Sequence, residues 1–529
     1  MKIMTVEGGA NLAYSGLASG IGRVWCASGL TTFFPSFSRM RAPGWRHWLR
    51  WLVLLGAIAG YMAVHVQLGR ELAAQTNHDP ARSDQANNME CAREAAERAA
   101  MKPEDGMSRN ISEWLPHYTD GVVNPLWPRV AATFRDEQAA REFFEQGKLW
   151  NVMFTAVFLG VAAIWLGFRW SVPAVLMFLL AAGMGSFLPR APWFQPEPLY
   201  YAFFFLSWVT GASLLRRNPV WRYALFGLVT GLAYLAKASV QPLMLVFCGV
   251  TTLRFLAAMW PSRRKEDGTE SRSAWTTSNH FIGMSVFLCI HLVVISPRLS
   301  YSQRAFGNPL HAFPSYWMWM DDFEQGYAWM GKFNTREKLD ALPKDQRPSF
   351  RTYMATHSGE TAWNRLADGT WWQVHRLLVS TPTPRDKHGT RKRHWKAVLE
   401  RPGWVLTSLA GLTLLATGFA FSLRRAEKLP VHCQEPERGM VLLYVFGAIA
   451  MYSMLHGWYT PVGDGERFML ALWAPLVFSL IGAGESIMAR LESRRAPVIL
   501  HWIFRIAQSA AVCWLAWRLI ELWRFPHFA

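Results

Sequence analysis

Long apolar runs recur along the chain from Trp48 to the C-terminus, and they constrain the fold more than any other feature. Most of them have roughly 17–22 residues, close to the length of about 20 that a helix needs to cross a bilayer. Inside a membrane the backbone must satisfy its own hydrogen bonds, so such runs form helices. The sequence therefore predicts an all-α integral membrane protein with about eleven transmembrane helices. We expect the spans at 48–68, 149–168, 171–189, 199–215, 223–236, 240–259, 280–297, 403–422, 439–457, 467–484 and 498–521.

The 529-residue chain is basic, with 55 Lys and Arg against 37 Asp and Glu and a formal net charge of +18. In a soluble protein this excess would suggest nucleic-acid binding. Here many basic residues stand in short loops between the apolar runs, where they set the orientation and contact anionic lipid headgroups. We therefore expect membrane lipid, and no nucleic acid, among the partners.

The distribution of charge also predicts the orientation in the membrane. With eleven spans, the short basic loops fall inside and two long polar segments, 69–148 and 298–402, fall outside. Because basic residues favour the cytoplasmic side, we predict a multi-pass protein of the plasma (inner) membrane with a cytoplasmic N-terminus. The basic residues that flank the first span are Arg39, Arg41, Arg46 and Arg50.

Three units are expected along the chain. Residues 1–47 are Gly- and Ser-rich and lack the pattern of a cleaved signal peptide, so we interpret them as a disordered cytoplasmic tail. Residues 48–485 form the main transmembrane domain, with amphipathic helices in its two outer segments. Residues 486–529 contain an inner loop and the last transmembrane helix.

The polar stretch 83–92 opens the first outer segment, soon after the first span. Asp84 in this stretch lies near the membrane surface, where water and solutes reach it. A carboxylate in that place can remove a proton from a hydroxyl or amine group, so Asp84 is the candidate general base. The alternative is structural, because aspartate is a preferred N-cap and a helix is predicted over 84–101.

Two more charged residues stand at predicted outer ends of spans. Glu197 lies between two prolines. It could hold a metal or orient a substrate. The alternative is a carboxylate at the start of a helix, where the helix dipole favours a negative charge. Lys237 interrupts an otherwise apolar stretch. A cation at that depth is costly, which indicates a function such as phosphate binding, although the long side chain can also reach the headgroups.

Arg467 begins an apolar run at the outer face, shortly after Tyr459. Basic residues are less common on this side of a membrane. Its guanidinium group suits a phosphate, which predicts a role in substrate binding. The alternative is a local ion pair with Glu466 or Asp464.

The second outer segment contains an aromatic and then acidic stretch at 316–322. Its rings can stack on sugars, but aromatic residues also anchor proteins at membrane interfaces. Asp321 and Asp322 suggest a metal site, yet no third ligand at metal spacing accompanies them. The stretch 360–378 is typical of an amphipathic helix that lies at the interface.

The order of these motifs resembles that of the GT-C superfamily of polyprenyl-phosphate-dependent glycosyltransferases. This superfamily includes the protein O-mannosyltransferases and the lipid A aminoarabinose transferases. The resemblance covers about residues 48–485, although no second acid stands beside Asp84 as it does in the O-mannosyltransferases. The matching stretches are 83–92, 124–128, 143–148, 197–199, 231–239, 304–310 and 465–468.

The resemblance implies an enzyme that moves a sugar from a polyprenyl-phosphate carrier to a glycan, lipid or protein acceptor on the outer (periplasmic) face. Asp84 would be the catalytic base, and Lys237 and Arg467 would face the carrier phosphate. Glu197 and Tyr459 are expected to complete the substrate site. No cofactor follows from the sequence, and a divalent cation with unknown ligands is left open. The alternative is a transporter or flippase of a lipid-linked sugar, which would use the cations but no base.

Overall fold

The computed structural model describes residues 45–81, 84–100, 116–134, 140–215, 219–259, 270–343, 345–378, 436–463, 466–493 and 498–524. Within these ranges every regular element is helical, as the sequence predicts. The tail predicted for 1–47 lies almost entirely outside them, and so does the span predicted for 403–422.

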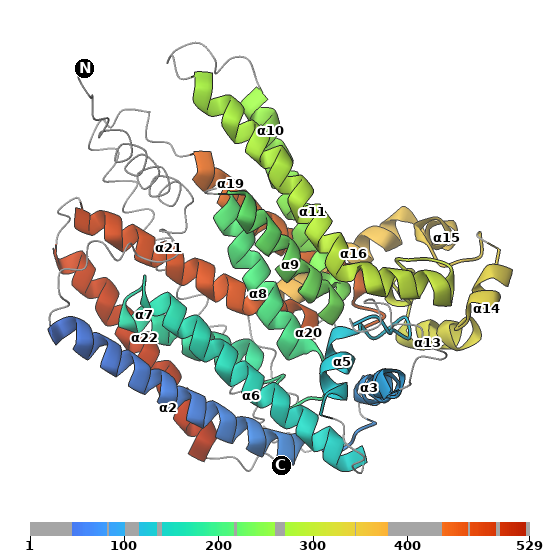
Figure 1. The fold of residues 1–529 in the computed structure, drawn as a ribbon, viewed down its shortest axis with the longest axis horizontal. Coiled ribbons are helices and arrows are strands. Elements are labelled where there is room, and N and C mark those ends of the chain that lie inside the picture. The colour runs from blue at the N-terminus through green and yellow to red at the C-terminus, as the bar shows by residue number, and fades with distance from the viewer. Residues whose placement is uncertain are drawn as a thin grey trace, which may run out of the picture.

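The long helices form a bundle that spreads apart away from the end with α3, α5 and α13 (Figure 1). They are α2 (Trp45–Thr76), α6 (Ala140–Gly167), α7 (Val172–Ala182), α8 (Glu197–Leu214), α9 (Val220–Ala236), α10 (Gln241–Met259), α11 (Glu270–Phe306), α19 (Pro436–Tyr459), α21 (Trp473–Ser493) and α22 (Val498–Arg524). A π-helical turn, Gly183–Phe187, extends α7, and a 3-10 turn, Ala238–Val240, separates α9 from α10.

Six helical stretches among the described residues are long and apolar enough to cross a membrane. They are His47–Gln75, Ala140–Gly167, Ala238–Leu256, His280–Phe306, Gly439–Tyr459 and Trp502–Trp523. Shorter apolar helices occupy Val172–Phe187, Val220–Ala236 and Leu470–Ser486. The described part of the chain is thus all-helical and of membrane-spanning type, and the count of eleven spans stays a prediction.

Smaller helices build the two polar segments. The first segment contains α3 (Gln85–Ala100) and α5 (Leu126–Ala132). The second contains α12 (Pro314–Trp317), α13 (Phe323–Lys332), α14 (Arg336–Ala341), α15 (Phe350–Thr356) and α16 (Gly359–Leu378). A short α20 (Glu466–Met469) and a 3-10 turn, Leu470–Leu472, precede α21. The helices predicted over 84–101 and 360–378 are confirmed as α3 and α16.

Two predicted boundaries need correction. The sequence predicts an outer segment that ends at residue 148 and a span that begins at 149, but α6 is one continuous helix from Ala140, because its polar first turns contain no proline to separate them from its apolar body. Similarly, α11 begins at Glu270, before the span predicted for 280–297, and continues past Pro297 to Phe306. The stretch 124–128 leads straight into α5, whose Pro128 stands in the first turn, where proline is tolerated.

Both predicted outer segments lie at the same end of the bundle, where Figure 1 shows α3, α5 and α13 to α16. Polar contacts tie the opposite end together. Arg50 Nη2 donates to the carbonyl oxygen of Gly167 over 2.7 Å, and Arg254 Nη1 donates to that of Leu215 over 2.7 Å. This arrangement agrees with the predicted alternation of long polar segments and short basic loops. Which end faces the outside of the cell stays a prediction.

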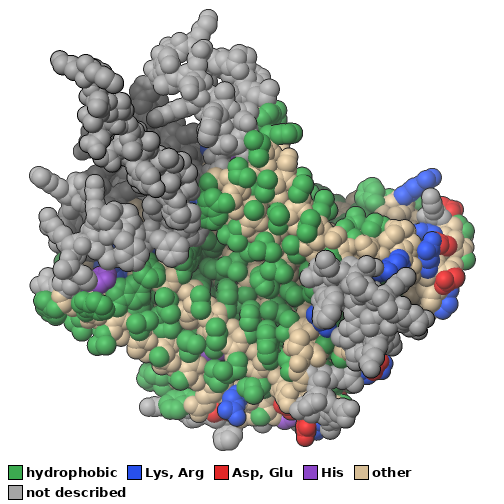
Figure 2. All heavy atoms as spheres, in the orientation of Figure 1, with side chains coloured by type: hydrophobic (Ala, Val, Ile, Leu, Met, Phe, Trp, Pro, Cys, Tyr) green, Lys and Arg blue, Asp and Glu red, His purple; other side chains and the backbone are tan. Residues whose placement is uncertain are grey.

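The flank of the bundle is apolar on its surface. Figure 2 shows hydrophobic side chains over the helices and charged side chains gathered over the end with the outer segments. Large apolar side chains that are more than half exposed include Leu52, Val161, Phe168, Leu245 and Val293. A surface of this kind needs an apolar solvent, which a bilayer supplies.

Candidate functional site

Four charged side chains from distant parts of the sequence meet at the end of the bundle that carries the outer segments. Lys237 Nζ lies 2.8 Å from Glu197 Oε1, and Arg467 Nη1 lies 2.6 Å from Asp84 Oδ2. The same Nη1 atom is 3.9 Å from Glu197 Oε1, which joins the two pairs. We call this alternation of two cations and two carboxylates the ion-pair chain. It unites all the predicted site residues except Tyr459.

Exposure differs along the ion-pair chain: it is highest at Asp84, at one end, and lowest at Glu197, which lies between the two cations. The exposed fraction of the side chain is 32% for Asp84, 22% for Arg467, 16% for Lys237 and 2% for Glu197. A molecule from the aqueous side therefore meets Asp84 and Arg467 first. Glu197 Oε2 is buried and accepts no hydrogen bond from any residue that the structure describes. Because a buried acceptor without a donor is costly, this oxygen marks a place where a ligand or a water molecule can donate.

Each member of the ion-pair chain stands at a helix end. Asp84 immediately precedes α3, Glu197 is the first residue of α8, Lys237 follows the last residue of α9, and Arg467 belongs to the short α20. The positive N-terminal end of α8 favours a carboxylate there. The hydroxyl of Tyr201, one turn into α8, donates to the carbonyl oxygen of Arg467 and so fixes α20 against α8.

The backbone break at Lys237 gives its ammonium group access to Glu197. Lys237 is extended, with φ −160° and ψ 126°, between α9 and the 3-10 turn. The hydroxyl of Tyr452, on α19, donates to the carbonyl oxygen of Ser239 within that turn. The break that the sequence predicts between the two apolar runs is therefore confirmed, and α19 holds it in place.

A buried pair of amides fixes the start of α3 beside the loop that leads into α8. Asn77 Nδ2 donates to Gln85 Oε1 over 2.6 Å, and Gln85 Nε2 donates back to Asn77 Oδ1 over 2.9 Å. The backbone amide of Phe194 also donates to Gln85 Oε1, over 2.9 Å. Because Gln85 follows Asp84 and Phe194 closely precedes Glu197, this pair sets the position of one carboxylate relative to the other.

Lys148 secures the C-terminal end of α2 in the same region. Its side chain is fully buried on α6, and Nζ donates to the carbonyl oxygens of Ala73 and Asn77 over 3.0 and 2.8 Å. These contacts satisfy carbonyl groups that a helix end leaves unpaired. Sequence reasoning did not assign a role to Lys148, Asn77 or Gln85. The sequence signal for Lys148 was its position, a lysine at the start of an apolar run.

Neighbouring charges determine the ionisation of the two most buried members. Burial alone raises the pKa of the Glu197 carboxyl, but the nearby Lys237 and Arg467 cations outweigh it and hold the pKa at about 2. Burial lowers the pKa of the Lys237 ammonium to about 8, against the opposing effect of Glu197. Both groups are therefore charged at neutral pH, which matches the short distance between them.

Tyr459 lies beside the ion-pair chain, within electrostatic reach of Asp84 and Arg467. It is the last residue of α19 and packs against a small hydrophobic cluster that includes Phe313 and Trp317. The second outer segment supplies these two aromatic residues. That segment therefore packs beside the end of the ion-pair chain that is most exposed.

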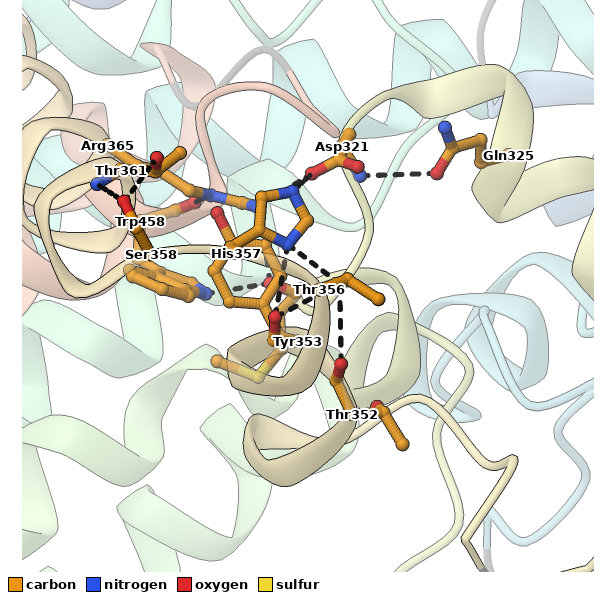
Figure 3. Close-up of polar contacts among 11 residues, drawn as sticks. Asp321, Gln325, Thr352, Tyr353, Thr356, His357, Ser358, Thr361, Arg365 and Trp458 are labelled. Carbon is orange, nitrogen blue, oxygen red and sulfur yellow. Dashed lines mark hydrogen bonds and ion pairs between the residues drawn. The ribbon is translucent and has the colours of Figure 1, made fainter.

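A second polar cluster, formed by Asp321, His357 and Arg365, lies within the second outer segment, and we call it the histidine cluster. His357 Nε2 is 3.1 Å from Asp321 Oδ1, and Arg365 Nη1 is 3.9 Å from the same oxygen. The other ring nitrogen, Nδ1, lies 3.1 Å from the carbonyl oxygen of Tyr353 (Figure 3). The Thr356 hydroxyl lies 2.9 Å from the same Nδ1 atom, so contacts with α15 fix the orientation of the ring.

Arg365 fastens this cluster to the transmembrane bundle. Its Nε donates to the carbonyl oxygen of Trp458 over 2.9 Å, and its Nη2 donates to that of Met318 over 3.2 Å. The guanidinium group also lies 4.8 Å from the ring centroid of Trp458. Asp322, the second acid of the suspected metal pair, instead accepts from the amide of Gln325 and caps α13.

The other sequence expectations fare unevenly at this site. Lys237 is paired with Glu197, so its side chain does not simply extend to the headgroups. Arg467 contacts Asp84, a partner that the sequence did not indicate, and Asp464 lies outside the described residues. No group of three or more His, Cys, Asp or Glu side chains among the described residues could hold a metal ion. The divalent cation that the sequence leaves open has no candidate ligand set in that part of the chain.

No protein-family model matches this chain, and no curated protein matches it either. The resemblance to GT-C glycosyltransferases therefore depends on the short motifs, their order and the predicted topology. Two of those motifs, 83–92 and 465–468, supply the residues of the Asp84–Arg467 pair.

Proposed function

We propose that this protein is a membrane glycosyltransferase that moves a sugar from a polyprenyl-phosphate carrier to an acceptor at the outer face. The ion-pair chain supports this proposal most directly. It joins a solvent-accessible carboxylate to two cations at one end of a bundle of apolar helices. A sugar phosphate on a lipid needs these parts together: a base in water, cations for phosphate, and an apolar surface for the lipid chain.

Asp84 acts as the general base in this proposal. About a third of its side chain is exposed, so an acceptor hydroxyl or amine can approach it from the aqueous side. Asp84 takes the acceptor's proton as the acceptor attacks the anomeric carbon. The carbon–oxygen bond to the phosphate breaks, and its electron pair stays on the phosphate.

Arg467 and Lys237 bind the carrier phosphate and stabilise the charge that develops on it. The planar guanidinium of Arg467 suits two phosphate oxygens, whereas the Lys237 ammonium contributes a compact charge. Tyr459 borders the sugar, and the buried Glu197 keeps Lys237 in position. The isoprenoid chain lies along the apolar flank of the bundle, where large hydrophobic side chains are exposed.

The direct test is release of free polyprenyl phosphate from a panel of lipid-linked sugars by purified protein. We expect release by the wild type and loss of release in Asp84→Asn. Asp321→Asn is the matched control, because Asp321 is an acid at the same end of the molecule that belongs to the histidine cluster. Thermal unfolding in detergent verifies that all three proteins are folded.

Two results would argue against the proposal. Full release by Asp84→Asn would remove Asp84 from the mechanism. No release from any donor, together with movement of the donor across the bilayer of proteoliposomes, would favour a transporter or flippase of a lipid-linked sugar.

A further inference from the structure

Arg467 lies near two carboxylates, those of Asp84 and Glu197, and this limits how the site can bind a further anion. Its Nη1 is 2.6 Å from Asp84 and 3.9 Å from Glu197, while Lys237 is held 2.8 Å from Glu197. The two cations are thus matched by two carboxylates before any substrate is present. An additional anion at this site has to compete with a carboxylate that is already bound.

Asp84 is the carboxylate that an incoming anion can displace. Glu197 is almost completely buried, and its charge is fixed between Lys237 and Arg467. Asp84 is about a third exposed and contacts only one of the two cations at ion-pair distance among the described residues. Separating Arg467 from Asp84 therefore costs much less free energy than separating it from Glu197. Water can solvate the partly exposed Asp84 carboxylate but not the buried Glu197.

We propose that Asp84 and the phosphate of the lipid carrier share Arg467, so that protonation of Asp84 during transfer strengthens the binding of the phosphate product. This inference rests on the proposed function and deepens it. It concerns how tightly the site holds a prenyl phosphate in each state of Asp84.

The charges in the transfer step balance along this route. The donor is a phosphodiester with one negative charge, and Asp84 carries another. When the acceptor attacks, its proton moves to Asp84, which becomes neutral, and the electron pair of the broken bond goes to the phosphate, which gains a second negative charge. One unit of negative charge has in effect moved from Asp84 to the phosphate, and both positions lie against the same guanidinium group. Arg467 therefore retains an anionic partner throughout.

A consequence is that the product is held most tightly immediately after transfer. Loss of the proton from Asp84 to water restores the competing carboxylate and weakens the hold on the phosphate. Release of the lipid product is thereby linked to deprotonation of Asp84, and the resting enzyme is protected from occupation by free carrier.

Binding of farnesyl phosphate, a short prenyl monophosphate, tests this inference without any turnover. Asp84→Asn imitates the protonated carboxyl group, so we expect it to bind farnesyl phosphate at least about tenfold more tightly than the wild type, about 1.4 kcal/mol. Arg467→Gln should bind more weakly than the wild type. The double variant should show no gain over Arg467→Gln, because the gain operates through Arg467. Farnesol, which lacks the phosphate, should bind all four proteins equally.

Several outcomes would overturn the inference. Equal or weaker binding by Asp84→Asn, in a variant whose thermal unfolding matches the wild type, contradicts it. A gain that persists in the double variant also contradicts it, because the gain would then not depend on Arg467. The release assay run beside these measurements separates the two proposals. If the wild type releases polyprenyl phosphate but Asp84→Asn shows no gain in affinity, the transferase proposal holds and the sharing of Arg467 is contradicted. If Asp84→Asn gains affinity but no donor releases polyprenyl phosphate, the transfer step is contradicted and the site only binds anions.

Discussion

The ion-pair chain and the histidine cluster are both built from carboxylates and basic side chains, yet they differ in reach and in burial. The ion-pair chain joins residues 84, 197, 237 and 467, whereas the histidine cluster joins residues 321, 357 and 365. The acid at the centre of the first, Glu197, is 2% exposed, and the acid of the second, Asp321, is 49% exposed.

This difference indicates that the two clusters solve separate problems. A buried charge depends on its partner, since removal of the partner leaves an uncompensated ion. An exposed charge retains its water and depends on its partner much less. The folded bundle should therefore depend strongly on the ion-pair chain, whereas the histidine cluster fastens the outer segment locally.

The largest contrast is expected between Glu197→Gln and Asp321→Asn. The first leaves Lys237 buried without its paired carboxylate, so it should lower the free energy of unfolding by roughly 3–5 kcal/mol. The second should change it by only about 0–1 kcal/mol. Thermal unfolding of both variants in the same detergent measures the two changes. Equal shifts in the unfolding temperature would contradict the distinction between the clusters. The pKa of Glu197 is below its ordinary value, so its stabilising effect is present above about pH 4.5 and is lost as the pH falls toward 2.

A smaller effect is expected where the second outer segment contacts the bundle. A Cβ atom at Gly369, on α16, would come within 2.1 Å of the carbonyl oxygen of Gly457, on α19. Gly369→Ala should therefore separate the two helices at a cost of roughly 1–3 kcal/mol. Gly331→Ala, on α13, is the matched control because nothing lies within 4 Å of that position. Hydrogen exchange in α16 should rise in the first variant alone, and unchanged exchange in both would show that α16 is held elsewhere.

The smallest expected effect concerns pH. Because the Lys237 pKa is lowered to about 8, its ammonium group loses charge as the pH rises past that value. Farnesyl phosphate should therefore bind severalfold more weakly at pH 9.5 than at pH 7.5. Lys237→Arg keeps its charge over this range and should lose much less affinity. A parallel decline in both proteins would assign the pH dependence to another group.

The sequence was most informative about features that depend on one helix alone, such as its position and its ends. Apolar length alone located the helices, and the polar break around Lys237 was visible as an interruption between two apolar runs. Asp84, Glu197, Lys237 and Arg467 were each selected for chemical reasons that concern one residue at a time, and the resemblance to GT-C transferases implied one shared site. The structure brings the four side chains together. Their pairing could not be predicted, because it depends on how four separate helix ends pack.

The supporting residues were hidden for a related reason. Asn77 and Gln85 look like ordinary polar residues near a membrane surface, and only the folded chain shows that each satisfies the other's amide group. The histidine cluster was missed as well, since Asp321 was considered with its neighbour Asp322 as a metal site. His357 and Arg365 approach Asp321 only after α15 and α16 fold back upon it.

The contact between Asp84 and Arg467 also has a consequence for the order in which the protein is made. Asp84 leaves the ribosome long before Arg467, and at about 5–20 residues per second the delay is roughly 20–80 s. Glu197 and Lys237 are separated by far fewer residues and can pair while the chain is still being inserted. The Glu197–Lys237 pair can thus form early, and the Asp84–Arg467 pair forms only when the late helices arrive. A nascent chain therefore carries an anchored lysine well before the ion-pair chain is complete.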